Sequence, residues 1–496
     1  MKQLNTLAVE QVPDFKILPP TRRDLYYGGG WHAPLSRDFT EVLNPATGEG
    51  LGAVAWAGAA DVERAVAAAQ GGFVRWRDMA PLERATIMKQ AAAAIRRHAG
   101  ELARLETADS GVPCQRIAPD VESGALAFEY FAGLVTELKG TTIPVGGKNL
   151  NYTLREPLGV IARINAFNHP FLFAAQHAAA ALAAGNSVIV KPAEQTPLSS
   201  LYLAEVIGSL FPAGVLSVLP GGRLCGEALA MHPKVAKVGL IGSLATGKAI
   251  LAAAAHTLKK VSLELGGKNA LIAYPDADRT NLSAGIVKGM NFAFLGQSCG
   301  STSRVFLHED IHDEVLERVV QAVRTMKFGD PRDPATEMGS LVSQAQLDKV
   351  SHYVELALGE GARLVLGGSR PPDPQLAKGF YFEPTIFADV TTRMRIAREE
   401  VFGPILSILK WRDEEELFTA VNELDYGLSA SIWTSDLLTA HRAAARVEAG
   451  YVWVNGAGAH YYGAPFGGYK QSGLGREESI EELIDNTQVK NVNISL

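Results

Sequence analysis

The chain has 496 residues, of which 47% are apolar and 20% are charged, and its formal net charge is −6. This length exceeds that of one small core, and the usual size of a domain predicts two or three units. Charges of both signs are scattered without a basic run, so we expect no nucleic-acid partner.

The three cysteines, Cys114, Cys225 and Cys299, lie far apart and lack the spacing of metal ligands. They predict neither a disulfide framework nor a metal site, and they favour a reducing compartment. The N-terminus lacks a basic start followed by a continuous apolar core, and no later stretch is an uninterrupted apolar span of transmembrane length. We therefore expect a soluble, cytoplasmic protein without a membrane partner.

The first part of the chain predicts an extended arm followed by helices. Residues 1 to about 20 have no periodicity and carry three prolines, which is typical of an extended arm. The apolar spacing is helical at 61–69 and again at 81–107, where Pro81 fits a first helical turn. These helices are expected to form the outer layer of a domain.

Between Leu158 and Gly267, short apolar runs alternate with helical segments. This alternation predicts a parallel sheet covered on both faces. The expected strands are GVIARI, NSVIVKP, GVLSVLP, VAKVGLIG and KKVSLEL, and the expected helices lie at 171–184, 199–210 and 247–255. Ligands bind such sheets at the carboxyl ends of the strands. Polar residues and glycines follow the strands there: Asn168, Lys191, Glu194, Gly221, Gly222, Gly242 and Ser243.

A second α/β series follows Cys299. We expect strands at SRVFLHED, ARLVLG, ILSILKW, SASIWT and YVWVN, and helices at 312–326, at 343–358 and after Asp413 and Asp436. The last segment, TQVKNVNISL, alternates like a strand. Such a strand needs a sheet to join, and another subunit is one source of that sheet.

The stretch FLGQSCGS presents Cys299 in a setting suited to a reacting thiol. Gly296 and Gly300 flank the cysteine and allow the backbone to approach a substrate closely. A buried structural cysteine is the alternative interpretation. The upstream stretch VSLELGGKNALI favours a reactive cysteine, because Glu264 lies where a carboxylate can serve as a general base for a thiol or a water.

Two further stretches indicate a nucleotide. GSLATG, residues 242–247, fits a strand-to-helix turn whose free N–H groups suit phosphate, although it is not the GxGxxG signature. In KPAEQTP, Lys191 can bind hydroxyls or phosphate, and Glu194 can accept both hydroxyls of a ribose. A 2′-phosphate would be repelled by that carboxylate, so NAD is favoured over NADP. The alternatives are an isolated glycine turn and two solvated charges.

Seven blocks together resemble the NAD(P)-dependent aldehyde dehydrogenase superfamily: INAFNHP, KPAEQTP, IGSLATG, LELGGK, GQSC, EEVFGP and PFGGYKQSGLGRE. Their order and spacing cover the chain from about Tyr26 to the C-terminus. The resemblance implies an α/β fold with three parts. These are a Rossmann-type NAD-binding domain at 20–138 and 158–266, an α/β catalytic domain at 267–468, and a small β oligomerisation arm at 139–157 and 480–496. It also implies a homodimer or homotetramer, with which the terminal strand agrees.

The resemblance assigns roles to particular residues. Cys299 matches the catalytic nucleophile, Glu264 the general base, and Asn168 the donor that stabilises the alkoxide together with the Cys299 backbone N–H. Lys191 and Glu194 match the positions that hold the adenosine ribose. Gly242 and Ser243 match positions beside the pyrophosphate, and Glu400 and Phe402 match those that hold the nicotinamide ribose and ring. The other cofactor-binding positions are Gly222, Gly226 and Gly247.

The positions that match the substrate tunnel hold rings and hydrogen-bonding groups: His169, Phe173, Gln176, Phe294, Ser298, Gly300, His460 and Phe466. This mixture favours an aromatic or polar aldehyde over a long fatty one. A histidine at a pocket wall is more often a packed, hydrogen-bonded side chain than a catalyst, so none is placed in the mechanism. The sequence departs from the commonest pattern at Ala166 and Phe167, where many members have Pro-Trp; a ring still precedes Asn168.

The predicted function is the oxidation of a small aldehyde to its carboxylic acid with NAD as hydride acceptor. The acyl group passes through a thioester on Cys299, and water activated by Glu264 hydrolyses it. A cysteine-dependent esterase or thioesterase without a redox step is one alternative. A catalytically silent binding or structural member is another, although such proteins usually lose the thiol or the base.

Overall fold

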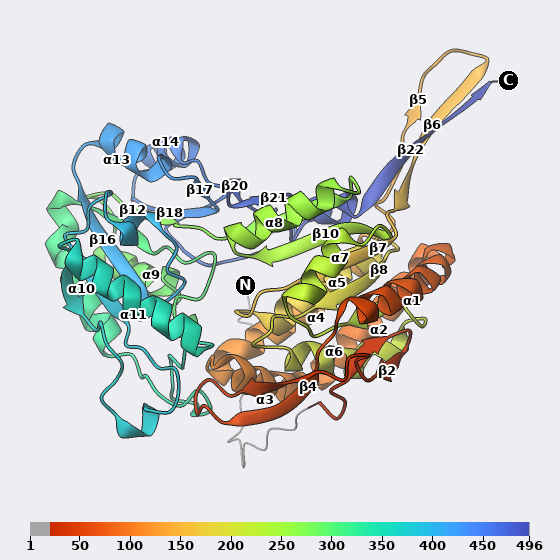
Figure 1. Ribbon diagram of the computed structural model, residues 1–496. Helices are drawn as coiled ribbons and strands as arrows, with labels where there is room; N and C mark the ends of the chain where they lie inside the picture. Colours follow the sequence, from red (N-terminus) through yellow and green to blue (C-terminus); the bar gives the residue numbers. More distant parts are fainter. Residues whose placement is uncertain (1–19, 496) are drawn as a thin grey trace.

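The computed structural model describes residues 20–495, so the extended arm predicted for the residues before that range lies outside it. Two α/β units lie side by side, and a narrow β arm projects from one of them (Figure 1). Across the described residues, no helix combines the length and the apolar character that crossing a bilayer requires.

The first unit is built on an eight-stranded sheet in the order β2-β1-β9-β8-β7-β10-β11-β21. All five predicted strands are confirmed and run parallel: β7 (Val160–Ile164), β8 (Ser187–Lys191), β9 (Leu216–Val218), β10 (Val235–Gly242) and β11 (Lys260–Leu265). The order reverses at β7, with β8 and β9 on one side and β10 and β11 on the other. Such a reversal is where open α/β sheets bind ligands.

The predicted parallel sheet is extended at both edges by strands that were not predicted. Short antiparallel strands close it: β1 (Leu25–Tyr27) pairs with β9 and with β2 (Gly30–His32), and β21 (Gly473–Leu474) pairs with β11. Each is two or three residues long, too short to give a period of alternation. Very short outer strands also limit the edge that is open to another chain.

Alternate residues of the parallel strands enter two separate cores. Ile161, Val188 and Val190 pack against helices α2 (Pro81–Arg97) to α6 (Leu198–Ile207). Val160 and Ile189 on the opposite face pack with α1 (Ala59–Asp78), α7 (Arg223–Met231) and α8 (Leu244–Ala255). This two-sided burial explains why the strands read as continuous apolar runs. The intervening helices are α3 (Ala99–Ser110), α4 (Cys114–Gly133) and α5 (Pro170–Ala183).

The helices differ from the prediction in several places, and α4 and α9 (Arg279–Gly289) are among those that were not predicted. The helical segment predicted at 81–107 is two helices, because the chain breaks at His98, which has φ −105° and ψ 16°. Helix α7 was not predicted, although Gly222 precedes it as the N-cap residue.

The second unit has a seven-stranded sheet in the order β14-β15-β16-β13-β12-β18-β19. The strands are β12 (Ala270–Ala273), β13 (Arg304–His308), β14 (Arg363–Leu366), β15 (Thr385–Ala388), β16 (Ile405–Trp411), β18 (Ser429–Trp433) and β19 (Tyr451–Val454). Its helices are α9 (Arg279–Gly289), α10 (Glu309–Arg324), α11 (Gln344–Gly359), α12 (Arg395–Arg398), α13 (Glu414–Asn422) and α14 (Leu437–Arg446). The chain passes from β11 of the first sheet to β12 of the second through only four residues, 266–269.

The arm is a three-stranded antiparallel sheet in the order β22-β6-β5. The terminal strand β22 (Thr487–Ser495) pairs along its whole length with β6 (Asn149–Pro157), and β6 pairs with β5 (Thr142–Ile143). The sheet that this strand needs therefore comes from its own chain rather than from another subunit. Figure 1 shows the arm extending well away from both units.

Smaller elements complete the described chain: β3 (Phe39–Leu43), β4 (Gly50–Ala55), β17 (Tyr426–Gly427), β20 (Tyr469–Lys470), α15 (Ile480–Asp485) and the 3₁₀ turns η1 (Gly208–Leu210), η2 (Phe292–Phe294) and η3 (Pro374–Leu376). The domain boundaries given above remain predictions.

Candidate active site

The three residues predicted to carry the chemistry arrive from separate parts of the chain. Asn168 lies between β7 and α5, Glu264 is the penultimate residue of β11, and Cys299 lies in the loop between η2 and β13. The His169 ring, next to Asn168, lies 4.5 Å from the Phe294 ring at the start of the cysteine loop. The segment that carries Asn168 and the loop that carries Cys299 are therefore neighbours.

The loop before Cys299 has an unusual backbone. Asn291 and Leu295 adopt φ values of 55° and 54°, which non-glycine residues rarely take, and Gly296 follows with φ 63°. At Gly296, a Cβ would stand 2.2 Å from the Gly403 carbonyl oxygen. The close approach of these two backbones requires glycine there, and it fixes the loop against the chain that follows Phe402.

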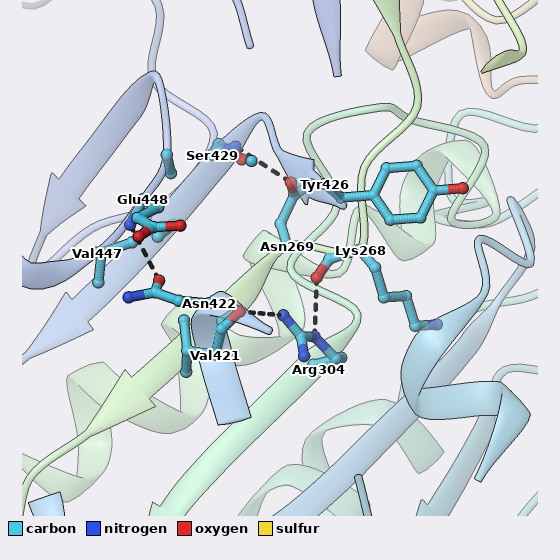
Figure 2. Close-up of a pocket in the computed structure, with 13 residues that line it drawn as sticks. Lys268, Asn269, Arg304, Val421, Asn422, Tyr426, Ser429, Val447 and Glu448 are labelled. Atoms are coloured by element: carbon cyan, nitrogen blue, oxygen red, sulfur yellow. Dashed lines mark hydrogen bonds between the residues drawn. The ribbon is translucent and has the colours of Figure 1, made fainter. Parts of the chain in front are cut away.

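Asn269 fixes the other end of the cysteine loop. Its side-chain amide donates to the carbonyl oxygens of Cys299, at 2.6 Å, and of Ser301, at 3.1 Å. Its side-chain oxygen accepts from the Ser429 N–H at 3.1 Å, and Figure 2 shows this contact. Asn269 is 4% exposed, so these bonds are shielded from water. The sequence interpretation missed this residue.

The residue before Asn269 is also buried. Lys268 is 2% exposed, and burial lowers its pKa to about 7. Its carbonyl accepts from the Arg304 guanidinium at 2.8 Å, as Figure 2 shows. Hydrogen bonds thus tie the crossover between the two sheets to the second unit and to the cysteine loop.

The buried Glu264 and the partly buried Cys299 have pKa values that depend on each other. Glu264 is 3% exposed, and burial raises the pKa of its carboxyl well above the ordinary range, although hydrogen bonding with the Cys299 thiol lowers it. Burial also raises the pKa of the Cys299 thiol, and the Glu264 charge raises it further. The two groups therefore resist being negatively charged at the same time. When the thiol ionises, its proton must pass to an acceptor, so that one of the two groups stays neutral.

Two buried carboxamides on the segment that follows β7 have side-chain atoms without hydrogen-bond partners among the described residues. Asn168 is 4% exposed, and its buried side-chain oxygen has no hydrogen-bond partner among residues 20–495. In the same range, neither side-chain polar atom of Asn165 is partnered. Buried polar atoms are normally satisfied, so such groups suit a ligand or water. Asn165 was not predicted, although it lies with Asn168 in the stretch INAFN.

The predicted adenosine-side residues converge around Gly222. A Cβ on Gly222 would stand 3.3 Å from a Glu194 carboxylate oxygen and 3.0 Å from the Trp56 ring. The Lys191 side chain lies 3.8 Å from the Cβ position of Gly226, and burial lowers its pKa. The exposed Glu194 carboxylate and the buried Lys191 ammonium thus lie beside the backbone of Gly222 and Gly226.

The turn from β10 into α8 has the form predicted for a phosphate site. Ser243 is the N-cap residue of the twelve-residue helix α8, and its hydroxyl accepts from the Thr246 N–H at 3.2 Å. Gly242 ends β10 just before it. Gly247 faces Leu265, whose side chain would lie 2.8 Å from a Cβ there, so the helix packs closely on the end of β11.

The predicted nicotinamide-side residues meet the crossover segment. A Glu400 carboxylate oxygen accepts from the Gly267 N–H at 3.0 Å, and a Cβ on Gly266 would overlap the same carboxylate. Phe402 has φ 57°, and its ring lies 5.6 Å from the Phe167 ring. These contacts place Glu400 and Phe402 between Glu264 and the Asn168 segment. With the two preceding groups, they fit a dinucleotide: a ribose-binding carboxylate, a helix N-terminus and a second carboxylate beside the reacting pair.

The predicted tunnel residues form two aromatic groups. His169 contacts Phe294 and, at 5.5 Å between ring centroids, Phe173; the His460 ring lies 4.7 Å from Phe466. Gln176 is buried on α5, and the Ser298 hydroxyl accepts from Asn291 at 3.3 Å. Two carboxylates that were not predicted pair with the histidines, namely Asp120 and Glu478.

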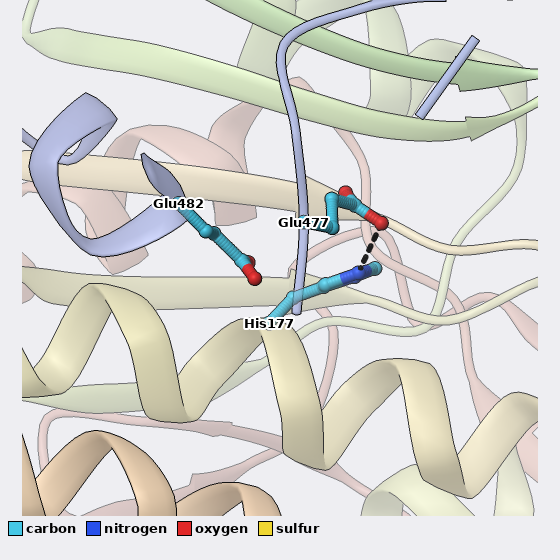
Figure 3. A group of neighbouring side chains, drawn as sticks. All are labelled: His177, Glu477 and Glu482. Carbon is cyan, nitrogen blue, oxygen red and sulfur yellow. Dashed lines mark hydrogen bonds and ion pairs between the residues drawn. The ribbon is translucent and has the colours of Figure 1, made fainter. Parts of the chain in front are cut away.

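Three neighbouring groups, His177, Glu477 and Glu482, have the composition of a metal site (Figure 3). Glu477, however, already accepts from Arg163 at 2.9 Å and from His177 at 3.0 Å. Burial alone would raise the pKa of Glu477, but the charges and hydrogen bonds of His177 and Arg163 lower it. Glu477 thus forms a buried network with Arg163 and His177 that joins the first sheet to the C-terminal segment.

Comparison with known proteins gives consistent matches. The family model described as "Aldehyde dehydrogenase family" matches residues 31–492. Aldehyde dehydrogenase tropH from Talaromyces stipitatus is 51% identical over 484 residues, which cover 96% of this chain and 94% of that protein. The solved NAD+ complex of an aldehyde dehydrogenase from Bacillus cereus is 38% identical, with a TM-score of 0.93 over 96% of this chain and 97% of that one. PnpE from Pseudomonas sp. WBC-3 is also 38% identical, with a TM-score of 0.93 over 96% and 98% of the chains.

Proposed function

The chain belongs to the aldehyde dehydrogenase family, and we propose that it oxidises an aldehyde to the carboxylic acid with NAD as hydride acceptor. The observation that carries this proposal is the partly buried Cys299 thiol next to the buried Glu264 carboxyl, with the Glu400 carboxylate close enough to add to the effect of burial in raising the pKa of both. Family membership supports the reaction class, and the residues of this chain support the assignment of roles.

Nucleophilic attack begins with the thiol of Cys299. Glu264 accepts its proton, and Sγ adds to the aldehyde carbon to form a tetrahedral alkoxide. The raised pKa of Glu264 suits a base that must take a proton from a thiol and later release it. The Asn168 side-chain amide and the Cys299 backbone N–H donate hydrogen bonds to the alkoxide oxygen.

Collapse of the alkoxide releases hydride from the substrate carbon and leaves a thioester on Cys299. When bound, NAD supplies the acceptor for that hydride. Glu264 first releases the thiol proton to solvent and then removes a proton from water, which attacks the thioester carbonyl; the sulfur leaves, takes up the proton held by Glu264, and the carboxylic acid is released. Because Glu264 is present and buried beside the sulfur, water is the acyl acceptor in this proposal.

The residues of the chain favour NAD over NADP in this proposal. The Glu194 carboxylate beside Gly222 would accept the ribose hydroxyls and repel a 2′-phosphate. Glu400, held by the Gly267 N–H, would bind the second ribose, and the start of α8 would face the pyrophosphate. One of the similar solved structures is an NAD+ complex.

We also propose that the chain forms a homodimer or homotetramer through its β arm. The arm exposes six large apolar side chains: Ile143, Val145, Leu150, Leu154, Val489 and Ile494. Such side chains on a projecting sheet are typical of a surface that is covered in an assembly.

The test of function is direct. Purified protein is mixed with an aromatic aldehyde and NAD, and NADH formation is followed by absorbance. Stoichiometric formation of NADH and carboxylic acid supports the proposal. Ester hydrolysis by Cys299 without NADH formation from any aldehyde would instead indicate the esterase alternative.

A further inference from the structure

A histidine–carboxylate pair lies beside the site of attack. His169 directly follows Asn168 and precedes helix α5, and its Nδ1 donates to a carboxylate oxygen of Asp120 at 2.6 Å. A carboxylate only accepts, so the Nδ1 proton is fixed by this bond. The other ring nitrogen, Nε2, is then the group that remains for a ligand, and the side chain is 18% exposed.

Aromatic rings surround this imidazole. Its ring centroid lies 4.5 Å from that of Phe294 and 5.5 Å from that of Phe173, and Phe294 begins the loop that presents Cys299. A flat substrate that places its aldehyde carbon at Cys299 and its oxygen near Asn168 would extend along these rings. Offset or edge contacts between rings favour an aromatic substrate there.

A second pair borders the other end of the same loop. His460 Nδ1 lies 3.1 Å from each carboxylate oxygen of Glu478, and its ring packs among Trp453, Tyr451 and Phe466. The Trp453 ring lies 4.0 Å from the Cβ position of Gly300, the residue after Cys299. Polar imidazoles therefore stand at both ends of an otherwise aromatic wall.

The charges near this wall are mainly negative. Burial lowers the pKa of His460, but Glu478 and Asp120 outweigh burial and raise it. Burial raises the pKa of Tyr462, and Glu478, Glu482 and Asp120 raise it further. The nearby Arg163 guanidinium is already paired with Glu477. An aldehyde that carries a carboxylate would therefore be repelled, whereas an uncharged hydroxyl would not.

We propose that His169, oriented by Asp120, is a specificity-determining residue that selects an uncharged, ring-hydroxylated aromatic aldehyde. The substrate hydroxyl hydrogen-bonds to Nε2 of His169 while the ring packs on Phe173 and Phe294. A hydroxyl suits this position because it can donate to a neutral imidazole or accept from a protonated one. The inference rests on the proposed aldehyde oxidation and names its substrate class.

The test compares aldehydes matched in shape. 3- and 4-hydroxybenzaldehyde, the corresponding methylbenzaldehydes and the carboxybenzaldehydes are assayed with NAD, and kcat/KM is measured for each. The wild-type enzyme should prefer at least one hydroxy isomer over its methyl analogue by about tenfold or more, the value of one hydrogen bond that is lost on substitution. The carboxy analogues should be the poorest substrates.

Variants test whether His169 causes the preference for hydroxylated aldehydes. His169→Phe keeps a ring against Phe294, so it should reduce the hydroxy-to-methyl ratio to about one while kcat/KM for the methyl analogue changes less than about threefold. Asp120→Asn should lower the same ratio partially, and it provides a second variant if His169→Phe does not fold. His352→Phe, on the exposed face of α11, is the matched control and should leave the ratio unchanged.

The outcomes separate the two proposals. If the wild-type enzyme oxidises methyl or carboxy analogues as well as the hydroxy compounds, or if both variants keep the wild-type ratio, the role of His169 is wrong while aldehyde oxidation stands. If no aldehyde yields NADH with the wild-type enzyme, the proposed function itself fails, and the substrate class fails with it.

Discussion

The Asn269 side-chain amide donates to the Cys299 carbonyl oxygen at 2.6 Å, and this bond ties the cysteine loop to the crossover between the two sheets. Glu264 lies five residues before Asn269 on the same continuous segment. One stretch of chain therefore carries the proposed base and also holds the proposed nucleophile. We infer that the relative position of thiol and carboxyl depends on this bond more than on any contact made by the sulfur itself.

Replacing Asn269 should loosen the cysteine loop. Asn269→Ala leaves the carbonyls of Cys299 and Ser301 without their donor, so we expect kcat to fall by about tenfold to a hundredfold, as a misplaced reacting group does. The free energy of unfolding should fall by about 1–3 kcal/mol. Steady-state kinetics and urea denaturation measure both. Asn281→Ala, at an exposed position of α9, should change neither.

Asn168 is expected to act only once negative charge develops on the substrate oxygen. Asn168→Ala should lower kcat by about a hundredfold or more and change KM much less, because the lost donor stabilises the alkoxide rather than the aldehyde. Asn168→Asp keeps the size but replaces the donor by a carboxylate, and it should be at least as slow. A change in KM alone would place Asn168 in substrate binding instead.

Glu194 should control the choice of cofactor. Glu194→Ser removes the carboxylate beside Gly222, so kcat/KM for NAD should fall and kcat/KM for NADP should rise, each by about tenfold. The comparison requires both cofactors at one saturating aldehyde concentration. Glu227→Gln, on the exposed side of α7, is the control. An unchanged NADP-to-NAD ratio in Glu194→Ser would show that the discrimination lies elsewhere.

Glu477 should contribute to stability in a pH-dependent way. Its pKa is lowered in the folded protein by His177 and Arg163, so its contribution is present above the pKa of an unfolded carboxyl and is lost as pH falls through the folded value. Glu477→Gln leaves Arg163 buried without its partner and should cost about 3–5 kcal/mol at neutral pH.

Denaturation of wild type and of Glu477→Gln at neutral pH and at pH 4 measures this effect. The difference in unfolding free energy between the two proteins should shrink at the lower pH. A difference that stays constant would mean that the loss comes from packing rather than from the charge.

Much of the architecture follows from strongly periodic sequence. The five parallel strands of the first sheet were predicted because each is buried on both faces and reads as a continuous apolar run. β12 was missed because its four residues follow β11 so closely that the pattern suggests one segment rather than strands of two different sheets. The edge strands are too short to give any period.

The residues of the candidate site also divide into those that the sequence predicts and those that it does not. Cys299, Glu264 and Asn168 each stand in short blocks of sequence with glycine or proline nearby, and resemblance assigns their roles. Asn269, Asp120 and Glu478 were not predicted, because their importance lies in partners that are far away in sequence, such as His169 for Asp120. A carboxylate within a helix gives no local sign of which imidazole it will meet.

The most direct test of the account asks whether the acyl group is carried by Cys299. The variant Glu264→Gln is mixed with an aromatic aldehyde and NAD, quenched in acid, and examined by intact-protein and peptide mass spectrometry. Because Glu264 also accepts the thiol proton, we predict a slowed first turnover that forms about one NADH per active site, little turnover thereafter, and one acyl group on the peptide that contains Cys299. Aldehyde oxidation that continues undiminished in Cys299→Ala, or an acyl group found on any other residue, would contradict the account.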